Sequence, residues 1–207
     1  MSSHARVNVV VALKAEARPL LRRYNLKPAG QSGLYANESG DLGLMVGGVG
    51  RTHASRAVGL IHHTGIDSAP TAWLNVGIAG HGSAPPGTAL LAHEVLERAS
   101  GRLLYPRGDG LACPGVATTA VCTVDEPETD YQPDWAYDME ASGFMDAAFR
   151  VSGLRPVQCL KIVSDGPTSS CRNLSAHMVE ELVDSCTEAV DEVLVTQGLS
   201  LPAISQR

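Results

Sequence analysis

The chain has 207 residues, enough for one sizeable hydrophobic core, and its 44% hydrophobic and 18% charged residues are typical of a globular protein and exclude a disordered one. Its net charge of −6 leaves no broad basic surface for a nucleic-acid backbone, so we expect a small molecule as its partner. Five cysteines without a C-x-x-C pair argue against a zinc site.

The first predicted element is an almost unbroken apolar, β-branched run at residues 7–13, which is typical of a strand covered on both faces. This run is far too short to cross a membrane, and the residues around it lack the cleavage-site layout of a signal peptide. We therefore expect a cytoplasmic protein with reduced thiols and no membrane span.

Strand-like and helix-like segments alternate along the rest of the chain. Further strands are predicted at residues 42–49, 71–76, 88–93, 116–124 and 157–163. Helices are predicted at residues 16–24, 53–63, 137–151 and 175–196. This alternation predicts an α/β fold with a central mixed, largely parallel sheet flanked by helices. Because no internal repeat is present and residues 125–134 have the composition of a surface loop rather than a linker, we expect a single domain over residues 1–207.

Several residues suited to a binding site come where predicted strands end. Glu16 follows the first strand, glycine-rich segments at 47–50 and 77–80 follow the next two, and Ser164 and Asp165 follow the last. Ligands of such sheets gather at the carboxyl ends of the strands. We expect the glycine segments to be tight turns that bring the backbone close to a ligand, although plain strand-to-helix turns explain them nearly as well.

Two acidic motifs near the end of the chain are the strongest indication of function. Residues 136–146 read AYDMEASGFMD, with Glu140 at a helix start, and residues 160–166 read LKIVSDG, with Ser164 and Asp165 at a strand end. Two carboxylates from successive elements can converge on one ligand. Taken singly, each also has a structural interpretation: Glu140 as a first-turn helix acid, and Asp165 as a helix cap or an Asx-turn.

Five segments, in this order, resemble the purine nucleoside phosphorylase/nucleosidase superfamily, and most closely methylthioadenosine/S-adenosylhomocysteine nucleosidase-like proteins. They are VNVVVALKAEARPLL, VGGVGRTHA, LNVGIAGH, DMEASGF and KIVSDG. The resemblance spans about residues 7–195. It implies a three-layer phosphorylase/hydrolase-like fold, a homodimer, and cleavage of a purine N-glycosidic bond without a metal or an organic cofactor.

The resemblance also implies a role for each matched residue. Asp165, positioned by Ser164, would donate a proton to N7 of the base, because a purine leaves far more readily when it is protonated. Glu16 would activate the attacking water, and Glu140 would accept hydrogen bonds from the ribose hydroxyls. The other substrate-binding positions implied are Met139, Gly77, Ile78, Lys161 and Val124.

Three positions depart from the family pattern. Ile78 stands where the nucleosidases carry a small hydroxyl residue, Lys161 replaces an arginine and loses its bidentate fork, and His81 replaces a glycine. A turn histidine is more often simply exposed than in contact with a ligand. Ile78 and Lys161 therefore favour an altered substrate or a loss of activity.

The main prediction is hydrolysis of an adenosine-type nucleoside, because the opening segment lacks the Gly-rich, arginine-bearing pattern of the phosphorylases. Phosphorolysis, an unusual adenosylated substrate, and a catalytically inactive nucleoside-binding protein remain as alternatives. The base-stacking aromatic of the family has no clear counterpart, and Tyr131, Trp135 or Tyr137 could take its place on a lid-like loop.

Overall fold

The structure is a computed structural model that describes residues 6–64, 71–108 and 113–201. The strands are β1 (Arg6–Val11), β2 (Lys27–Pro28), β3 (Leu34–Ala36), β4 (Leu42–Val46), β5 (Thr71–His81), β6 (Ala89–Glu97), β7 (Arg102–Leu104), β8 (Ala117–Thr123), β9 (Trp135–Asp138) and β10 (Val157–Asp165). The helices are α1 (Lys14–Arg23), α2 (Arg51–His63), α3 (Ala141–Val151), α4 (Ala176–Ser185), α5 (Thr187–Thr196) and a short 3₁₀ helix, η1 (Cys171–Asn173). Residues 1–5, on which the expectation about a signal peptide partly depends, lie outside the described ranges.

The predicted α/β fold with a mixed central sheet is confirmed. The strands follow the order β10-β6-β8-β9-β5-β1-β4-β3-β2, and β7 pairs with β6. β1 is parallel to both of its neighbours, β4 and β5, and β10 is parallel to β5. Because β10 also pairs with β6, the strands β5, β10, β6, β8 and β9 close into a ring. The parallel strands β1, β5 and β10 end on the same side, where a ligand is expected.

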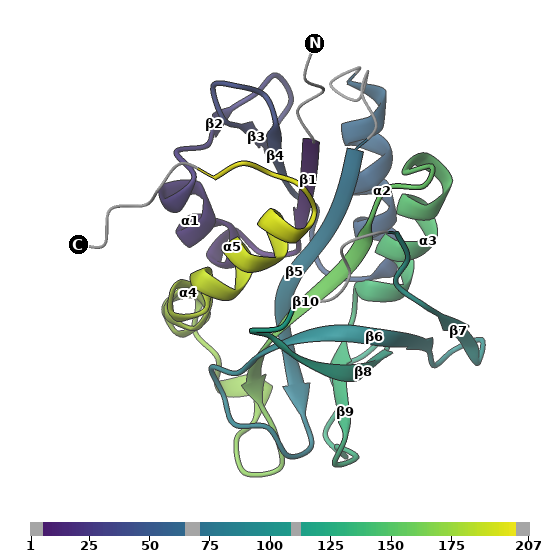
Figure 1. Cartoon of the computed structure of the whole chain (residues 1–207). Coiled ribbons are helices and arrows are strands. Elements are labelled where there is room, and N and C mark those ends of the chain that lie inside the picture. Colours follow the sequence, from purple (N-terminus) through teal and green to yellow (C-terminus); the bar gives the residue numbers. More distant parts are fainter. Residues whose placement is uncertain (1–5, 65–70, 109–112, 202–207) are drawn as a thin grey trace.

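Helices cover both faces of the sheet and give the molecule three layers (Figure 1): α1, α4 and α5 lie on one side, and α2 and α3 on the other. In β1, Val9 and Val11 pack in the same core cluster as Val190 of α5, while Val10 packs in the cluster of Phe144 from α3. Successive side chains of a strand point to opposite faces, so β1 is buried on both. This confirms the prediction from its unbroken apolar run.

The predicted turn at residues 77–80 is wrong, because β5 runs straight through this segment. Gly77 and Gly80 do not have the positive φ that a glycine turn requires. A Cβ atom at Gly80 would lie 2.4 Å from the ring of Tyr131 and 2.9 Å from a carboxylate oxygen of Asp165. The glycine therefore makes room for side chains that pack against the strand.

The predicted helix at residues 137–151 begins later than expected, at Ala141, because Tyr137 and Asp138 belong to β9. The Asp138 carboxylate accepts hydrogen bonds from the backbone N–H groups of Glu140 (3.2 Å) and Ala141 (2.7 Å). It thereby satisfies donors that the first turn of a helix leaves unpaired. The strand thus continues to Asp138, whose side chain accepts the hydrogen bonds of the backbone N–H groups at the helix start.

The long helix predicted at residues 175–196 is two helices, α4 and α5, that meet at Cys186. The Cys186 backbone has φ −106° and ψ 11°, which is not helical, and its thiol donates to the carbonyl oxygen of Gly87 at 3.1 Å. The apolar periodicity continues across the break, so the sequence does not reveal it. The short strands β2, β3 and β7 also carry no pattern long enough to be predicted.

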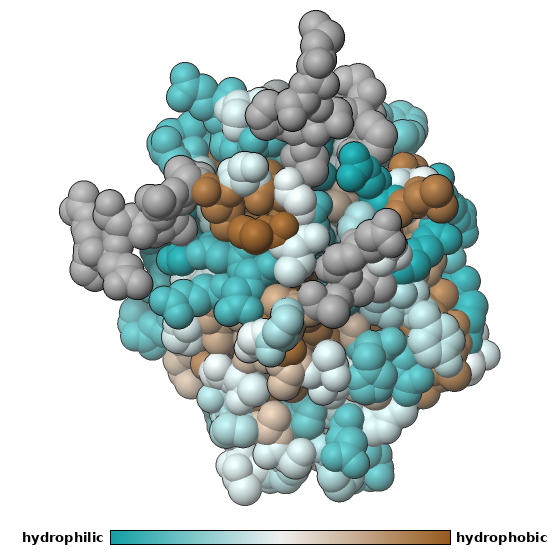
Figure 2. All heavy atoms as spheres, in the orientation of Figure 1, coloured by the Kyte–Doolittle hydropathy of each residue, from teal (hydrophilic) through white to brown (hydrophobic). Residues whose placement is uncertain are grey.

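The surface in the orientation of Figure 2 is mainly hydrophilic, and hydrophobic side chains gather on it in separate patches. Exposed large hydrophobic residues include Val49, Leu103, Tyr105 and Leu154. Within the described ranges, no helix combines the length and the apolar character that a membrane crossing requires.

Two glycines within helices provide a test of the packing between α2 and α3. A Cβ atom at Gly143 of α3 would lie 2.2 Å from the backbone oxygen of Arg51, whereas a Cβ atom at Gly59 of α2 would meet nothing within 4 Å. Alanine favours a helix over glycine, so Gly59→Ala should stabilise the protein by about 0.5–1 kcal/mol. Gly143→Ala should instead destabilise it by roughly 1–3 kcal/mol, because the helices must separate. Urea unfolding measures both; equal stabilisation by the two variants would contradict this packing.

Candidate active site

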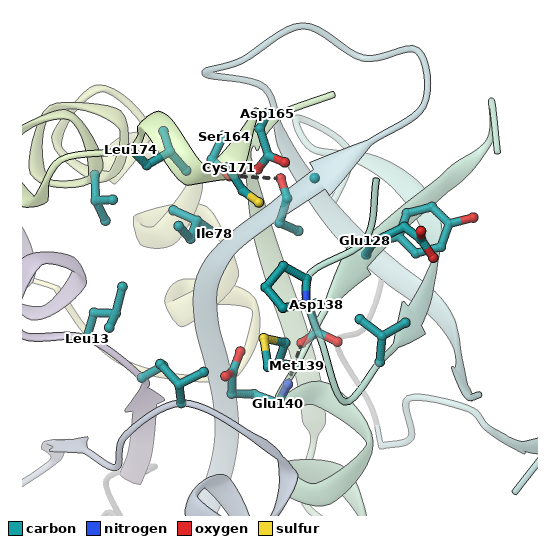
Figure 3. Close-up of a pocket in the computed structure, with 18 of the residues that line it drawn as sticks. Leu13, Ile78, Glu128, Asp138, Met139, Glu140, Ser164, Asp165, Cys171 and Leu174 are labelled. Atoms are coloured by element: carbon teal, nitrogen blue, oxygen red, sulfur yellow. Dashed lines mark hydrogen bonds between the residues drawn. The ribbon is translucent and has the colours of Figure 1, made fainter. Parts of the chain in front are cut away.

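A cavity of about 390 Å³ lies at the carboxyl ends of β1, β5 and β10 (Figure 3). In Figure 3, Ser164 and Asp165 lie at one end of this cavity and Met139 and Glu140 at the other. The predicted site residues that line it are Glu16, Ile78, Val124, Met139, Glu140, Ser164 and Asp165. The other two predicted positions, Gly77 and Lys161, are buried and do not line the cavity.

Glu16 lies in the first turn of α1, and its carboxylate is held by three backbone N–H groups. Those of Ala12 (2.9 Å) and Leu13 (2.8 Å) donate to Oε2, and that of Ile78 (3.0 Å) donates to Oε1. Burial raises the pKa of Glu16, although these hydrogen bonds and the charge of Lys161 oppose the rise. The carboxylate is therefore fixed in position and more basic than an exposed glutamate.

Glu140 is fixed by the glycine turn between β4 and α2. The backbone N–H of Gly50 donates to Oε1 of Glu140 at 2.7 Å. Gly48 and Gly50 both have φ of +103°, a conformation that side-chain-bearing residues rarely adopt, so this turn depends on glycine. Burial and the nearby charge of Asp138 raise the pKa of Glu140 to about 7.

Lys161 forms a buried ion pair with Asp138 instead of entering the cavity. Its Nζ lies 2.6 Å from Oδ2 of Asp138 and donates to Oδ1 of Asn75 at 2.5 Å. The other carboxylate oxygen of Asp138 accepts a hydrogen bond from the hydroxyl of Thr123 at 2.7 Å. Burial alone would lower the pKa of Lys161, but the charge of Asp138 and other nearby groups outweigh this effect and raise it, so the ammonium group stays charged.

A bulge in β10 presents the Ser164–Asp165 pair to the cavity. Val163 is paired with Ala79, and Asp165 with the next residue of β5, Gly80, so that Ser164 is an extra residue in the ladder. The Ser164 hydroxyl donates to Oδ1 of Asp165 at 2.5 Å, and the hydroxyl of Tyr131 donates to Oδ2. Asp165 is only 3% exposed. Its two carboxylate oxygens are therefore largely shielded from solvent, and each has a hydrogen-bond partner within the protein.

Aromatic side chains of two neighbouring segments line the cavity: Tyr131 comes from residues 125–134 and Tyr137 from β9. Tyr131 and Tyr137 both line the cavity, with their rings edge-to-face and their centroids 5.6 Å apart. Trp135 is not among the lining residues. Of the three aromatic residues suggested by the sequence, Tyr131 and Tyr137 are thus the two that can touch a bound molecule.

His81 does not line the cavity. Its Nδ1 accepts hydrogen bonds from the backbone N–H groups of Ser83 (3.0 Å) and Ala84 (2.9 Å), and its Nε2 lies 3.2 Å from the hydroxyl of Thr119. Burial lowers the pKa of His81, which favours the neutral ring that this arrangement requires. His81 therefore stabilises the end of β5.

The sequence did not predict the residues that form one wall of the cavity. Cys171 and Arg172 of η1, Leu174 directly after it and Val179 of α4 line this wall. The position of this segment directly after the S-D motif is the one available signal, and no periodicity indicates which of its side chains face the strand ends. Within the described ranges, no group of three or more His, Cys, Asp and Glu side chains is arranged to hold a metal ion.

The raised pKa of Glu140 predicts a pH dependence of stability. Between pH 4.5, its ordinary pKa, and about 7, the folded state retains a proton that the unfolded chain has released. The free energy of unfolding should therefore fall as the pH rises through this window, by up to roughly 3 kcal/mol. Glu140→Gln should reduce this fall and leave only the smaller part that the raised pKa of Glu16 contributes, and Glu38→Gln, at an exposed carboxylate, should retain it in full. Urea unfolding at pH 5 and pH 7 measures the difference, and an unchanged slope in Glu140→Gln would rule out the assignment.

Comparisons with known proteins point to one fold. No family model and no curated protein matches the sequence. The structure of Arabidopsis thaliana 5'-methylthioadenosine nucleosidase matches with a TM-score of 0.76 at 17% identity, covering 95% of this chain and 97% of that chain. Helicobacter pylori futalosine hydrolase matches with a TM-score of 0.72 at 12% identity, covering 94% and 99%.

A 5'-methylthioadenosine/S-adenosylhomocysteine nucleosidase from Colwellia psychrerythraea, solved in complex with adenine, matches with a TM-score of 0.69 at 17% identity, covering 95% of this chain and 98% of that chain. At such identities the likeness concerns the fold. The resemblance inferred from the five sequence segments is confirmed at that level. This chain has the fold of the methylthioadenosine/S-adenosylhomocysteine nucleosidases and of futalosine hydrolase.

Proposed function

We propose that this protein hydrolyses the N-glycosidic bond of an adenosine-type nucleoside. The observation that carries the proposal is one cavity with acidic groups at both ends, Asp165 at one and Glu140 at the other (Figure 3). A nucleoside has a matching polarity, with a base that must gain a proton at one end and a hydroxyl-bearing sugar at the other. The fold shared with nucleosidases supports the same reaction.

Asp165 is the proposed general acid. Its proton passes to N7 of the base while the C–N bond breaks and its electron pair leaves with the base. The short hydrogen bond from Ser164 and the nearly complete burial of Asp165 support a carboxyl group held in one orientation. A fixed donor is effective because no reorganisation is needed when the bond breaks.

Glu16 is the proposed base that takes a proton from the attacking water, whose oxygen bonds to the anomeric carbon. Its raised pKa makes it a better proton acceptor than an exposed glutamate. Its three backbone hydrogen bonds hold it still, and it lies near enough to Glu140 for its charge to raise the pKa of that residue. These features support a position beside the sugar.

Glu140 is the proposed ribose clamp, because a carboxylate accepts hydrogen bonds from two neighbouring hydroxyls. Contacts that shorten as the sugar ring flattens towards the transition state increase the rate. The support for this role is its fixed position, which the N–H of Gly50 maintains. Met139 would pack against the sugar from the same turn.

The wall formed by Leu13, Val49, Ile78, Leu174 and Val179 is apolar. It supports a nucleoside whose 5' substituent is uncharged and apolar, such as methylthioadenosine. A charged amino-acid tail would lose its hydration against this wall without gaining a partner from these side chains. Ile78, which departs from the family pattern, then fits as part of this wall.

A homodimer and a cytoplasmic location are further parts of the proposal. Val49 is 45% exposed although it lines the cavity, which supports a second subunit at the cavity mouth. All five cysteines are free thiols, which supports a reducing compartment.

The reaction is tested by release of free adenine from methylthioadenosine in phosphate-free buffer. Asp165→Asn, which cannot supply the proton, should reduce kcat by ~10²–10⁴. Asp184→Asn, at an exposed carboxylate on α4, should leave kcat unchanged and serves as the control.

Each other outcome points to a different function. Adenine release only in the presence of phosphate would replace hydrolysis with phosphorolysis. Binding of methylthioadenosine, detected as a thermal shift, without release of adenine would indicate a nucleoside-binding protein. Full activity of Asp165→Asn would remove this residue from the mechanism.

A further inference from the structure

The hydrogen bond between Tyr131 and Asp165 occupies the group that the reaction needs. Oδ2 of Asp165 accepts from the Tyr131 hydroxyl and Oδ1 from Ser164. Burial, followed by the hydrogen bond to Asp165 and the charge of that carboxylate, raises the pKa of Tyr131, so the phenol remains protonated and acts as the donor. A purine that approaches Asp165 in this state meets a carboxylate whose two oxygens are already engaged.

The ring of Tyr131 packs against Gly80 of β5, and the absence of a side chain at Gly80 leaves room for it. A Cβ atom at Gly80 would lie only 2.4 Å from Cε1 and 3.0 Å from Cζ of the Tyr131 ring. Any other residue at Gly80 would displace this ring from Asp165. The ring also meets Tyr137 edge-to-face, with the two centroids 5.6 Å apart. Tyr131 is therefore held next to Asp165 by the packing of its ring against Gly80 and Tyr137 as well as by the hydrogen bond of its hydroxyl.

The segment that carries Tyr131, residues 125–134, is anchored near both ends. Near its start, Asp125 accepts from Arg51 at 3.0 Å and Glu128 forms an ion pair with Arg98. Near its end, the hydroxyl of Ser83 donates to the carbonyl oxygen of Pro133 at 2.6 Å.

The ion pairs that anchor the segment are more exposed to solvent than the hydrogen bond between Tyr131 and Asp165. Each ion pair has one exposed member, Asp125 at 61% and Arg98 at 50%, whereas the partners Arg51 and Glu128 are 31% and 13% exposed, and solvent at the exposed member weakens such a pair. The segment is thus an ordered strap that can move at small cost without unfolding the sheet below it.

We propose that Tyr131 is a gating residue of this site, whose hydroxyl closes Asp165 in the empty protein and must be displaced by the base of the incoming nucleoside. The inference rests on the proposed function. Once displaced, the ring remains next to the cavity and forms a wall for the base together with Tyr137. Displacement of the Tyr131 hydroxyl frees Oδ2 of Asp165 to take up a proton from solvent, and this is the proton that Asp165 then donates to N7 of the base.

The kinetic test uses Tyr131→Phe, which removes the hydroxyl and keeps the ring. The base no longer has to break a hydrogen bond to a buried carboxylate, so KM for methylthioadenosine should fall roughly tenfold while kcat stays within about twofold. The matched control is Tyr105→Phe, at a tyrosine that is 57% exposed and outside the cavity, and it should change neither constant. An unchanged or raised KM in Tyr131→Phe would overturn the gate.

A second measurement needs no nucleoside and separates failure of the gate from failure of the proposed function. Urea unfolding of the wild type, Tyr131→Phe, Asp165→Ala and the double variant gives a double-mutant cycle. The double variant should lose less stability than the sum of the single losses, because both single changes remove the same hydrogen bond. Additive losses would overturn the gate whatever the activity. Coupled losses in a protein that neither binds nor cleaves methylthioadenosine would instead overturn the proposed function and, with it, gating by a nucleoside.

Discussion

The buried ion pair between Lys161 and Asp138 is the interaction on which the rest of the site depends. Both side chains are almost completely buried, and a charge in such a position is costly unless it is paired and hydrogen-bonded. Asn75, which donates in turn to the carbonyl oxygen of Val10, and Thr123 complete the pairing, so the network ties together β1, β5, β8, β9 and β10. The turn formed by Asp138, Met139 and Glu140 is fixed in position as a consequence.

The same pair determines the electrostatics of the sugar end of the cavity. Lys161 is a single positive charge near three acids, Glu16, Asp138 and Glu140, and of these it forms its ion pair with Asp138. The other two acids keep raised pKa values because the shared cation offsets only part of the effect of burial.

The sequence predicted the parts of the fold and site that depend on local patterns. The apolar run of β1 indicated a strand covered on both faces, and the acidic motifs indicated residues that do line one cavity. What it could not predict depends on contacts between distant segments. Gly80 looked like part of a turn because its partner Tyr131 lies some fifty positions later, and the break at Cys186 depends on the carbonyl of Gly87. Such pairings leave no periodicity in a single sequence.

At Gly77 and Gly80 the requirements of the strand differ from those of the cavity beside it. Their backbone is ordinary extended strand, so β5 would form with many other residues at these positions. The space above them is taken by Glu16, with Oε1 3.2 Å from the Cβ position at Gly77, and by Tyr131 and Asp165 over Gly80. A single added methyl group at either position would keep the strand and displace side chains of the cavity, so a mutation in the central strand of the sheet can disrupt the proposed site without loss of the fold.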